Sequence, residues 1–296
     1  MTVEVLQASR PARAWTTRLA AGLAVSLALV VVYHRTAAAL WHAWQSDDNY
    51  SHGPLVPLVS AALAWRARDR WRATPSASDA RGLGLVALAC GLQVAGTRAG
   101  VLALECYSLL LMLFGLSLTF QGAARTRVLA FPLGYLGFMM IFPPFVVIQV
   151  SYALKEITVA LATRMAEACG VLLQRSGMTL FLSGGPVRIE NPCSGLRSLV
   201  ALLATGAVFA YLQPGGLARR AVLFFAAVPL AMLGNALRIA AILIVGHYAG
   251  IERATGAFHD QSGYWVYALA LAGLLLIRHL LTPATVTATR EREVPA

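Results

Sequence analysis

Long apolar stretches alternate with short polar and basic segments along most of the chain. Eight of them are candidates to cross a bilayer as helices, approximately residues 15–34, 50–65, 82–98, 100–120, 128–149, 193–212, 220–247 and 263–281. The stretch at 50–65 is short, and two prolines lie near its start. The pattern predicts an all-α polytopic membrane protein with about eight transmembrane helices.

The segment between the fifth and sixth stretches has a different pattern. From Tyr152 to Leu173, apolar residues mix with charged ones at helical spacing, which predicts an amphipathic helix on the membrane surface. From Met178 to Glu190, two short runs flank the turn residues at 184–186. These runs predict a small β-hairpin on the outer face, directly before Cys193.

Composition supports a membrane protein. Of the 296 residues, 58% are hydrophobic and 12% are charged, whereas soluble domains are about 25% charged. No internal repeat or linker divides the chain, so we expect one membrane domain over residues 15–281 between tails at 1–14 and 282–296. No small-residue cleavage site clearly follows the first apolar stretch, which therefore predicts a retained helix and not a signal peptide.

The basic residues indicate how the chain is oriented. The net charge is +11, but the basic side chains lie in short segments between apolar stretches, which is typical of membrane topology and not of nucleic-acid binding. With eight spans, fifteen of the 24 basic residues fall on the side of the N-terminus and seven on the other side. Both termini are therefore predicted to be cytoplasmic.

The residues around Cys193 carry the first candidate chemistry. Asn191 is a good helix N-cap and Pro192 suits a first helical position, so Cys193 is predicted on the first turn of a helix. Free backbone N–H groups and the helix dipole favour a thiolate there, and Arg197 lies one turn further on. The four cysteines have neither zinc-site nor disulfide spacing. We expect no metal and no cofactor.

Two further segments place polar residues at the outer face of the membrane, where Cys193 is also predicted. Arg238 lies within the seventh stretch, and Asn235 precedes it by three residues, so the two share a helical face. His259 and Asp260 are predicted in an outer loop before the eighth stretch. The alternative is that Arg238 only bridges helices or reaches toward the membrane surface, and that His259 is an ordinary loop histidine.

Together, Cys193, Arg238 and His259 suggest acyl transfer. A cysteine nucleophile requires a base that completes its deprotonation and an acid that protonates the leaving amine, and His259 is suited to both. Arg238 would stabilise the oxyanion of the intermediate. The predicted reaction is cleavage of an amide through a thioester at Cys193.

Four sequence blocks resemble the exosortase/archaeosortase family. They are residues 48–58 (DNYSHGPLVPL), followed by Trp65, and residues 192–199 (PCSGLRSL), 235–239 (NALRI) and 259–263 (HDQSG). The blocks occur in the family's order over nearly the whole chain. By resemblance, the nucleophile is Cys193, the family's arginine is Arg238 and its histidine is His259. In the first block, Tyr50, Ser51 and His52 either line a substrate entrance or cap a short helix, and we favour the structural role.

The resemblance also implies a substrate. Family members are multipass membrane cysteine proteases, viewed as transpeptidases. For this chain we expect the bacterial inner membrane and an active site on the periplasmic face. The partners of family members are exported proteins whose C-terminal sorting signal combines a short motif (Pro-Glu-Pro), a transmembrane helix and a basic tail. The acceptor is water, a membrane lipid or a polysaccharide. The alternatives are a transporter that binds an anion through Arg238, and a membrane acyltransferase that uses His259 and Asp260.

Overall fold

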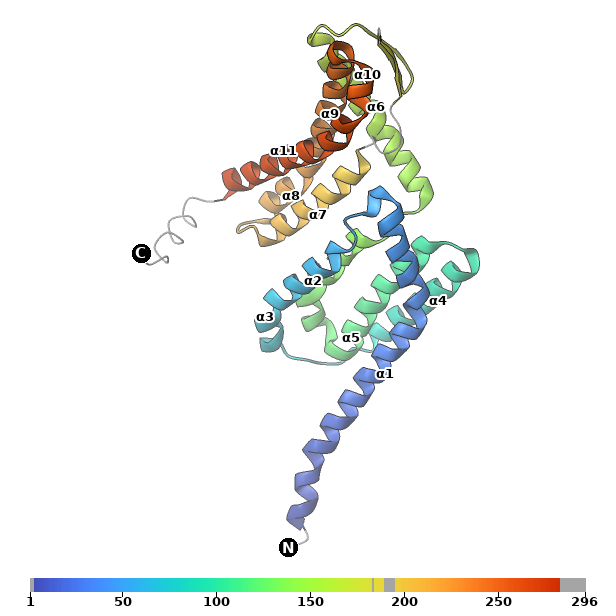
Figure 1. The fold of residues 1–296 in the computed structure, drawn as a ribbon. Helices are drawn as coiled ribbons and strands as arrows, with labels where there is room; N and C mark the ends of the chain where they lie inside the picture. The colour runs from blue at the N-terminus through green and yellow to red at the C-terminus, as the bar shows by residue number, and fades with distance from the viewer. Residues whose placement is uncertain (1–2, 183, 189–194, 283–296) are drawn as a thin grey trace.

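The computed structural model describes residues 3–182, 184–188 and 195–282, which are mostly helical (Figure 1). In chain order, the elements are α1 (Val3–Ser46), η1 (Asp48–Tyr50), α2 (Leu55–Arg66), α3 (Arg68–Ala73), α4 (Arg81–Ala99), α5 (Leu102–Tyr135), η2 (Leu136–Met139), α6 (Pro144–Ala168), β1 (Leu173–Ser176), β2 (Thr179–Leu182), β3 (Gly185–Arg188), α7 (Leu196–Leu212), α8 (Leu217–Phe225), α9 (Ala227–Ala249), α10 (Ile251–Thr255) and α11 (Ala257–Leu281).

Helices α1, α2, α4 and α5 form the half of the molecule that carries the N-terminus (Figure 1). Helix α4 ends at Gly100, in a left-handed conformation, and α5 begins two residues later, so the two helices form a hairpin. Tyr33 of α1 packs against Ala89 and Met112 of this hairpin. Its hydroxyl lies 2.7 Å from that of Ser108, so the buried polar groups are paired within the apolar core.

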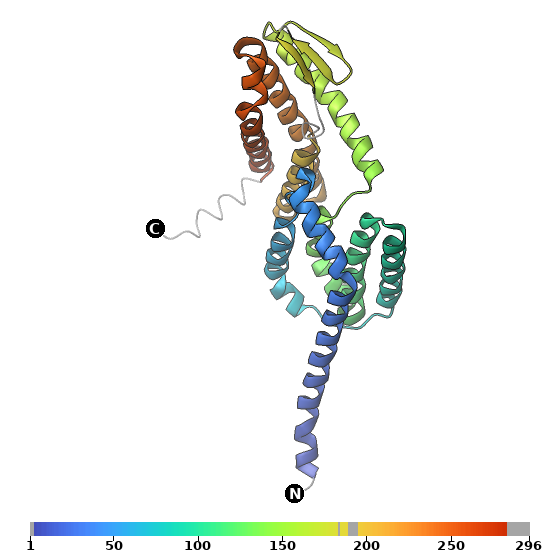
Figure 2. The same cartoon turned by 45° about the vertical axis from the view of Figure 1, so that its right-hand side comes forward.

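The other half contains α6 to α11 and the sheet, which lies at the end of the molecule remote from the N-terminus (Figure 2). Val159 of α6 and Leu243 of α9 are fully buried in one core cluster with Leu180 of the sheet. Leu202 of α7 and Leu274 of α11 belong to a second cluster, together with α8 and α9. Helix α9 contributes to both clusters and therefore forms the centre of this half.

The predicted hairpin is confirmed and extended. Strands β2 and β3 are antiparallel, with Leu180 opposite Val187, and β1 pairs with the other edge of β2. The sheet is therefore three-stranded. Leu180 and Val187 are both buried in the core cluster that contains α6 and α9, so one face of the sheet covers these helices.

Six helices are long and apolar enough to cross a membrane, so the structure does not reproduce the predicted eight among its described residues. Helix α2, with 12 residues, is too short, and α7 has 17. The stretch predicted at 128–149 is divided between α5, η2 and α6, because Pro143 has an extended ψ of 138° and Pro144 starts a new helix.

The surface helix predicted at 152–173 has different bounds. It forms the larger part of α6, which begins at Pro144, has 25 residues and is one of the six candidate spans. Helix α6 packs along α9 (Figures 1 and 2). Its charged residues did not mark a separate surface helix. They include Glu156, which is paired with Arg175 of β1.

Candidate functional site

The predicted site residues fall partly inside and partly outside the described structure. Cys193 lies outside the described residues, and His259 and Asp260 are described only as backbone in the first turn of α11. Asn235 and Arg238 are fully described in α9. Because His259 lies within α11, the prediction that it belongs to a loop is wrong: the helix begins two residues earlier, at Ala257.

Helix α7 does not begin where Asn191 and Pro192 predicted. Its first residue is Leu196, and its N-cap is Gly195, with a left-handed φ of 80°. Leu199 and Ser198 both donate hydrogen bonds to the Gly195 carbonyl, from the backbone N–H and the side-chain hydroxyl respectively. Glycine adopts this left-handed conformation readily, and α7 begins directly after it. The predicted placement of Cys193 on a first helical turn lies outside the described residues.

Gly195 is fixed by contact with Asn235 of α9. A Cβ atom at residue 195 would lie 2.8 Å from Asn235 Nδ2 and 3.0 Å from its Cγ, so only glycine fits without a shift. Asn235 is itself buried. Leu154 and Thr158 of α6 join both residues around a narrow crevice. The chain at Gly195, two residues after Cys193, is therefore packed against α9, one helical turn from Arg238.

Arg238 is partly buried on α9 and contacts α11. Its Nε donates a hydrogen bond of 3.1 Å to the hydroxyl of Ser262, which is buried. A Cβ atom at Gly263 would lie 3.8 Å from the guanidinium carbon, so the α11 backbone passes directly beside the cation. Close packing of Gly234 on Val266 brings the two helices together. These contacts explain how an arginine is tolerated within an apolar helix.

We refer to Gly195, Asn235, Arg238, Ser262 and Gly263 as the Arg238 cluster. It joins the N-terminus of α7, the middle of α9 and the start of α11. Ser262 and Gly263 belong to the sequence block at 259–263, but the sequence alone predicted no role for them. Their spacing from His259, three and four residues, was the available signal, because residues at that spacing share a helical face.

Arg197, which is predicted to add positive charge near Cys193, forms an ion pair with η1. One of its guanidinium nitrogens lies 3.4 Å from Asp48 Oδ1 of η1, and both side chains are more than half exposed. Such a pair contributes little stability. It nevertheless marks where the first block of the sequence meets the first turn of α7.

The first block, together with Trp44 near the end of α1, stabilises the break between η2 and α6. His52 Nε2 lies 3.0 Å from the Phe138 carbonyl, Trp44 Nε1 donates to the Met139 carbonyl, and the Phe142 N–H donates to the Tyr50 hydroxyl. These backbone groups have no helical partner, so the side chains satisfy them. Burial lowers the pKa of His52, the hydrogen bond to the Phe138 carbonyl partly opposes this shift, and the nearby charge of Arg197 adds to it. The contacts of Tyr50 and His52 agree with the structural role favoured for them.

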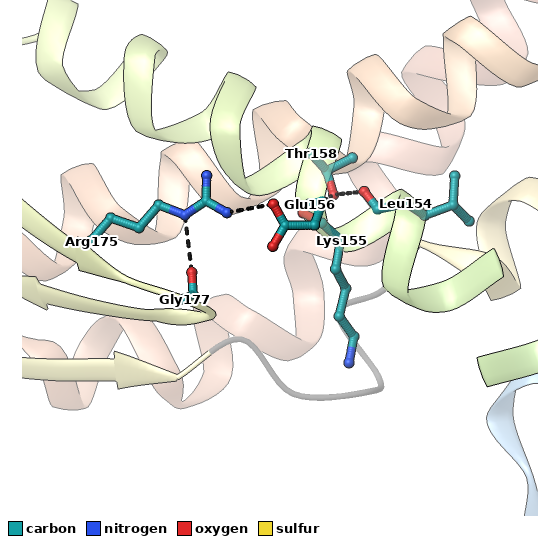
Figure 3. A network of polar contacts seen from close by, with 6 residues as sticks. All are labelled: Leu154, Lys155, Glu156, Thr158, Arg175 and Gly177. Carbon is teal, nitrogen blue, oxygen red and sulfur yellow. Dashed lines mark hydrogen bonds and ion pairs between the residues drawn. The ribbon is translucent and has the colours of Figure 1, made fainter. Parts of the chain in front are cut away.

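Polar contacts also connect the sheet to α6 (Figure 3). Arg175 of β1 donates to Glu156 over 2.9 Å and to the Gly177 carbonyl. Thr158, two residues after Glu156, bonds to the Leu154 carbonyl on its own helix. Because Leu154 and Thr158 line the crevice beside Gly195, the same segment of α6 supports both the sheet and the Arg238 cluster.

The cluster provides a cation and polar groups. Within the described part of the chain, no group of three His, Cys, Asp or Glu side chains is arranged to hold a metal ion. The guanidinium of Arg238 is a fixed, always charged donor in an apolar setting, where its interaction with a developing negative charge is strong. This arrangement suits the stabilisation of an oxyanion.

Comparison with known proteins is consistent with these contacts. No curated protein and no solved structure matches the chain. A model of the transmembrane exosortase family matches residues 44–276. The match includes the first block, the Arg238 cluster and the sheet, and covers well over half of the chain. The protein therefore belongs to the transmembrane exosortase family.

Proposed function

We propose that this exosortase-family protein is a cysteine transpeptidase that cleaves the C-terminal sorting signal of exported proteins. The observation that carries the proposal is the Arg238 cluster. Gly195, two positions after Cys193, packs against Asn235 of α9, and the partly buried Arg238, one turn further along α9, donates to Ser262, three positions after His259. A cluster built from three separate helices supports a shared site better than a helix-bridging arginine.

The proposed reaction begins with the Cys193 thiolate. Its sulfur attacks the scissile carbonyl carbon, and Arg238 stabilises the negative oxygen that develops. The C–N bond then breaks, and His259 gives its proton to the leaving amine. The exported protein remains attached to Cys193 as a thioester. His259 next removes a proton from the acceptor, whose oxygen or nitrogen displaces the sulfur and regenerates the thiolate.

Asn235 and Ser262 are proposed as positioning residues. Ser262 accepts a hydrogen bond from Arg238 and so orients the guanidinium, while Asn235 holds the chain at Gly195. We also propose that the reaction takes place at the outer face of the inner membrane, because the proposed substrates are exported proteins, with both termini on the cytoplasmic side. There the substrate's own membrane helix would deliver its scissile bond.

The experiment is substrate processing in a bacterial host. A tagged exported protein ending in Pro-Glu-Pro, a membrane helix and a basic tail is co-expressed with wild-type protein or a cysteine variant. We expect Cys193→Ala to abolish processing and Cys169→Ala to retain it, since Cys169 is an exposed cysteine at the end of α6. Immunoblots confirm equal membrane levels. Processing of the substrate by the Cys193→Ala variant at the wild-type rate would contradict the proposal.

The same host separates the proposal from an anion transporter. A transporter that binds its ligand through Arg238 predicts loss of function in Arg238→Ala and full function in Cys193→Ala. The transpeptidase predicts loss in both. The mass of the processed product identifies the acceptor, because hydrolysis leaves a free carboxylate whereas transfer adds the mass of a lipid or sugar.

A further inference from the structure

A second candidate site lies between α1, α4 and α5, helices that contribute no residue to the Arg238 cluster. A cavity of about 300 Å³ opens there. Arg35 of α1, Gln93 and Arg98 of α4 and Glu105 of α5 supply its polar groups, and Val32 and Val94 part of its apolar wall. Its volume is at the lower end of the range of small-molecule sites.

A buried hydrogen-bond chain supports the polar wall of this cavity. Thr36, which is fully buried, donates to Glu105 Oε2 over 2.7 Å and accepts from Gln93 Nε2 over 3.1 Å. Thr36 therefore fixes both side chains. Gln93 is only 8% exposed, and its Oε1 has no hydrogen-bond partner in the described structure. A buried acceptor without a donor is costly, so a ligand that supplies one is stabilised at this position.

The two arginines of the cavity are exposed and carry positive charge to its rim. Among the ion pairs formed by described residues, none joins Arg35 or Arg98 to Glu105. The cavity therefore offers cations and acceptors as separate groups. A ligand that satisfies both carries an anion and a hydrogen-bond donor in one small headgroup.

The cavity lies where lipid headgroups are found. Helix α4 has 19 residues, which corresponds to about 28 Å and so to the thickness of a bilayer core. Arg98 is its penultimate residue and therefore reaches the level of the lipid phosphates. Val32 and Val94 extend the wall toward the hydrocarbon region.

We propose that this cavity binds the headgroup of a phospholipid that carries a phosphate and a primary amine. Arg35 and Arg98 bind the phosphate, for which guanidinium groups provide matched donors. Glu105 and Gln93 Oε1 accept hydrogen bonds from the ammonium, and the valines contact an acyl chain. A choline headgroup fits less well, because its quaternary nitrogen has no N–H to donate.

Lipid binding to the purified full-length protein tests the proposal. The protein is stripped of lipid in a non-ionic detergent, and phosphatidylethanolamine, phosphatidylcholine or soluble phosphoethanolamine is added. Native mass spectrometry counts the bound molecules, and tryptophan fluorescence follows thermal unfolding. We expect one tightly bound phosphatidylethanolamine and a rise in the unfolding midpoint, with smaller effects of the other two compounds.

Variants locate the binding. Arg35→Gln/Arg98→Gln is expected to weaken phosphatidylethanolamine binding by at least about tenfold, because each charge-assisted phosphate contact is lost. Arg66→Gln/Arg70→Gln is the matched control, since it removes two exposed arginines elsewhere. Glu105→Gln keeps an acceptor for Thr36 but removes the charge, so it is expected to reduce the preference for ethanolamine over choline.

The single variant Arg98→Gln keeps the test informative if the double variant misfolds. Size-exclusion chromatography confirms that each protein is monodisperse. Equal phosphatidylethanolamine binding by wild type and the cavity variants would overturn the proposal, as would equal binding of phosphatidylcholine. Equal stabilisation by soluble phosphoethanolamine would overturn the assignment to a membrane lipid. None of these outcomes depends on whether Cys193 is the nucleophile.

Discussion

Replacement of Gly195 by alanine tests the contact that fixes the chain after Cys193. The left-handed conformation at residue 195, with φ of 80°, costs an alanine about 1–2 kcal/mol. The new Cβ would also lie 2.8 Å from Asn235 Nδ2, and overpacking of this kind typically costs about 1–3 kcal/mol. We therefore expect the free energy of unfolding to fall by about 2–5 kcal/mol, with reduced substrate processing.

Gly177→Ala separates the two effects. Gly177 also has a positive φ, of 60°, but nothing lies within 4 Å of the position of its Cβ. The free energy of unfolding of Gly177→Ala should therefore fall only by the backbone cost of about 1–2 kcal/mol, and this variant should retain full processing. Unfolding free energies are measured by denaturant titration in mixed micelles, with processing scored in the same preparations.

A double-mutant cycle with Asn235→Ala isolates the clash. Because Asn235→Ala removes the side chain that the new Cβ meets, the two substitutions should be non-additive by about 1–3 kcal/mol, with the double variant more stable than the sum predicts. If Gly195→Ala and Gly177→Ala cost the same, and Asn235→Ala shows no coupling, then residue 195 does not pack against α9 and the Arg238 cluster is incorrectly described.

Three further predictions concern contacts around the site. Ser262→Ala removes the acceptor for Arg238 Nε, so processing should fall about tenfold or more, since hydrogen bonds to charged groups contribute about 1.5–3 kcal/mol; an unchanged initial rate would show that Ser262 does not orient Arg238. The pKa of His52 is lowered below 6.5 by burial, so stability should decrease as the pH falls below about 6.5; His52→Gln should flatten this part of the stability curve, and an unaltered slope would assign the dependence to another group. Arg175→Glu breaks the half-exposed pair with Glu156 and should destabilise the sheet by about 1 kcal/mol or less, whereas Arg175→Glu/Glu156→Arg should recover the loss; failure of recovery would mean that the pair does not connect β1 to α6.

Much of the fold follows from hydropathy, but the breaks in the helices do not. The apolar stretch at 128–149 has no charge to divide it, so hydropathy alone does not show the break, and the adjacent Pro143 and Pro144 were the available signal. Strand β1 was missed because its sequence, LQRS, has no β-branched residue and is ordered by pairing with β2. The sheet hairpin was predictable because turn-forming residues at 184–186 interrupt the two runs, although Gly185 and Pro186 already pair with β2 as the first residues of β3.

The candidate site was predictable as a set of residue types and not as a set of contacts. An arginine in an apolar helix is visible in the sequence, and Arg238 proved to be partly buried on α9. Its partner Ser262 lies on a different helix, so no local pattern identifies the pair. The start of α7 was placed too early because Asn191 and Pro192 favour a helix start locally, whereas the contact of Gly195 with Asn235 is a tertiary constraint.

In the proposed reaction, Cys193 forms a thioester with the exported protein. The most direct measurement incubates purified wild-type protein with a tagged sorting-signal substrate, quenches the reaction in acid and maps modified cysteines by mass spectrometry. We predict that the peptide containing Cys193 carries the new C-terminus of the substrate, that hydroxylamine releases it, and that Cys169 is unmodified. Accumulation of cleaved product with no adduct on Cys193, or with the adduct on another residue, would contradict the account.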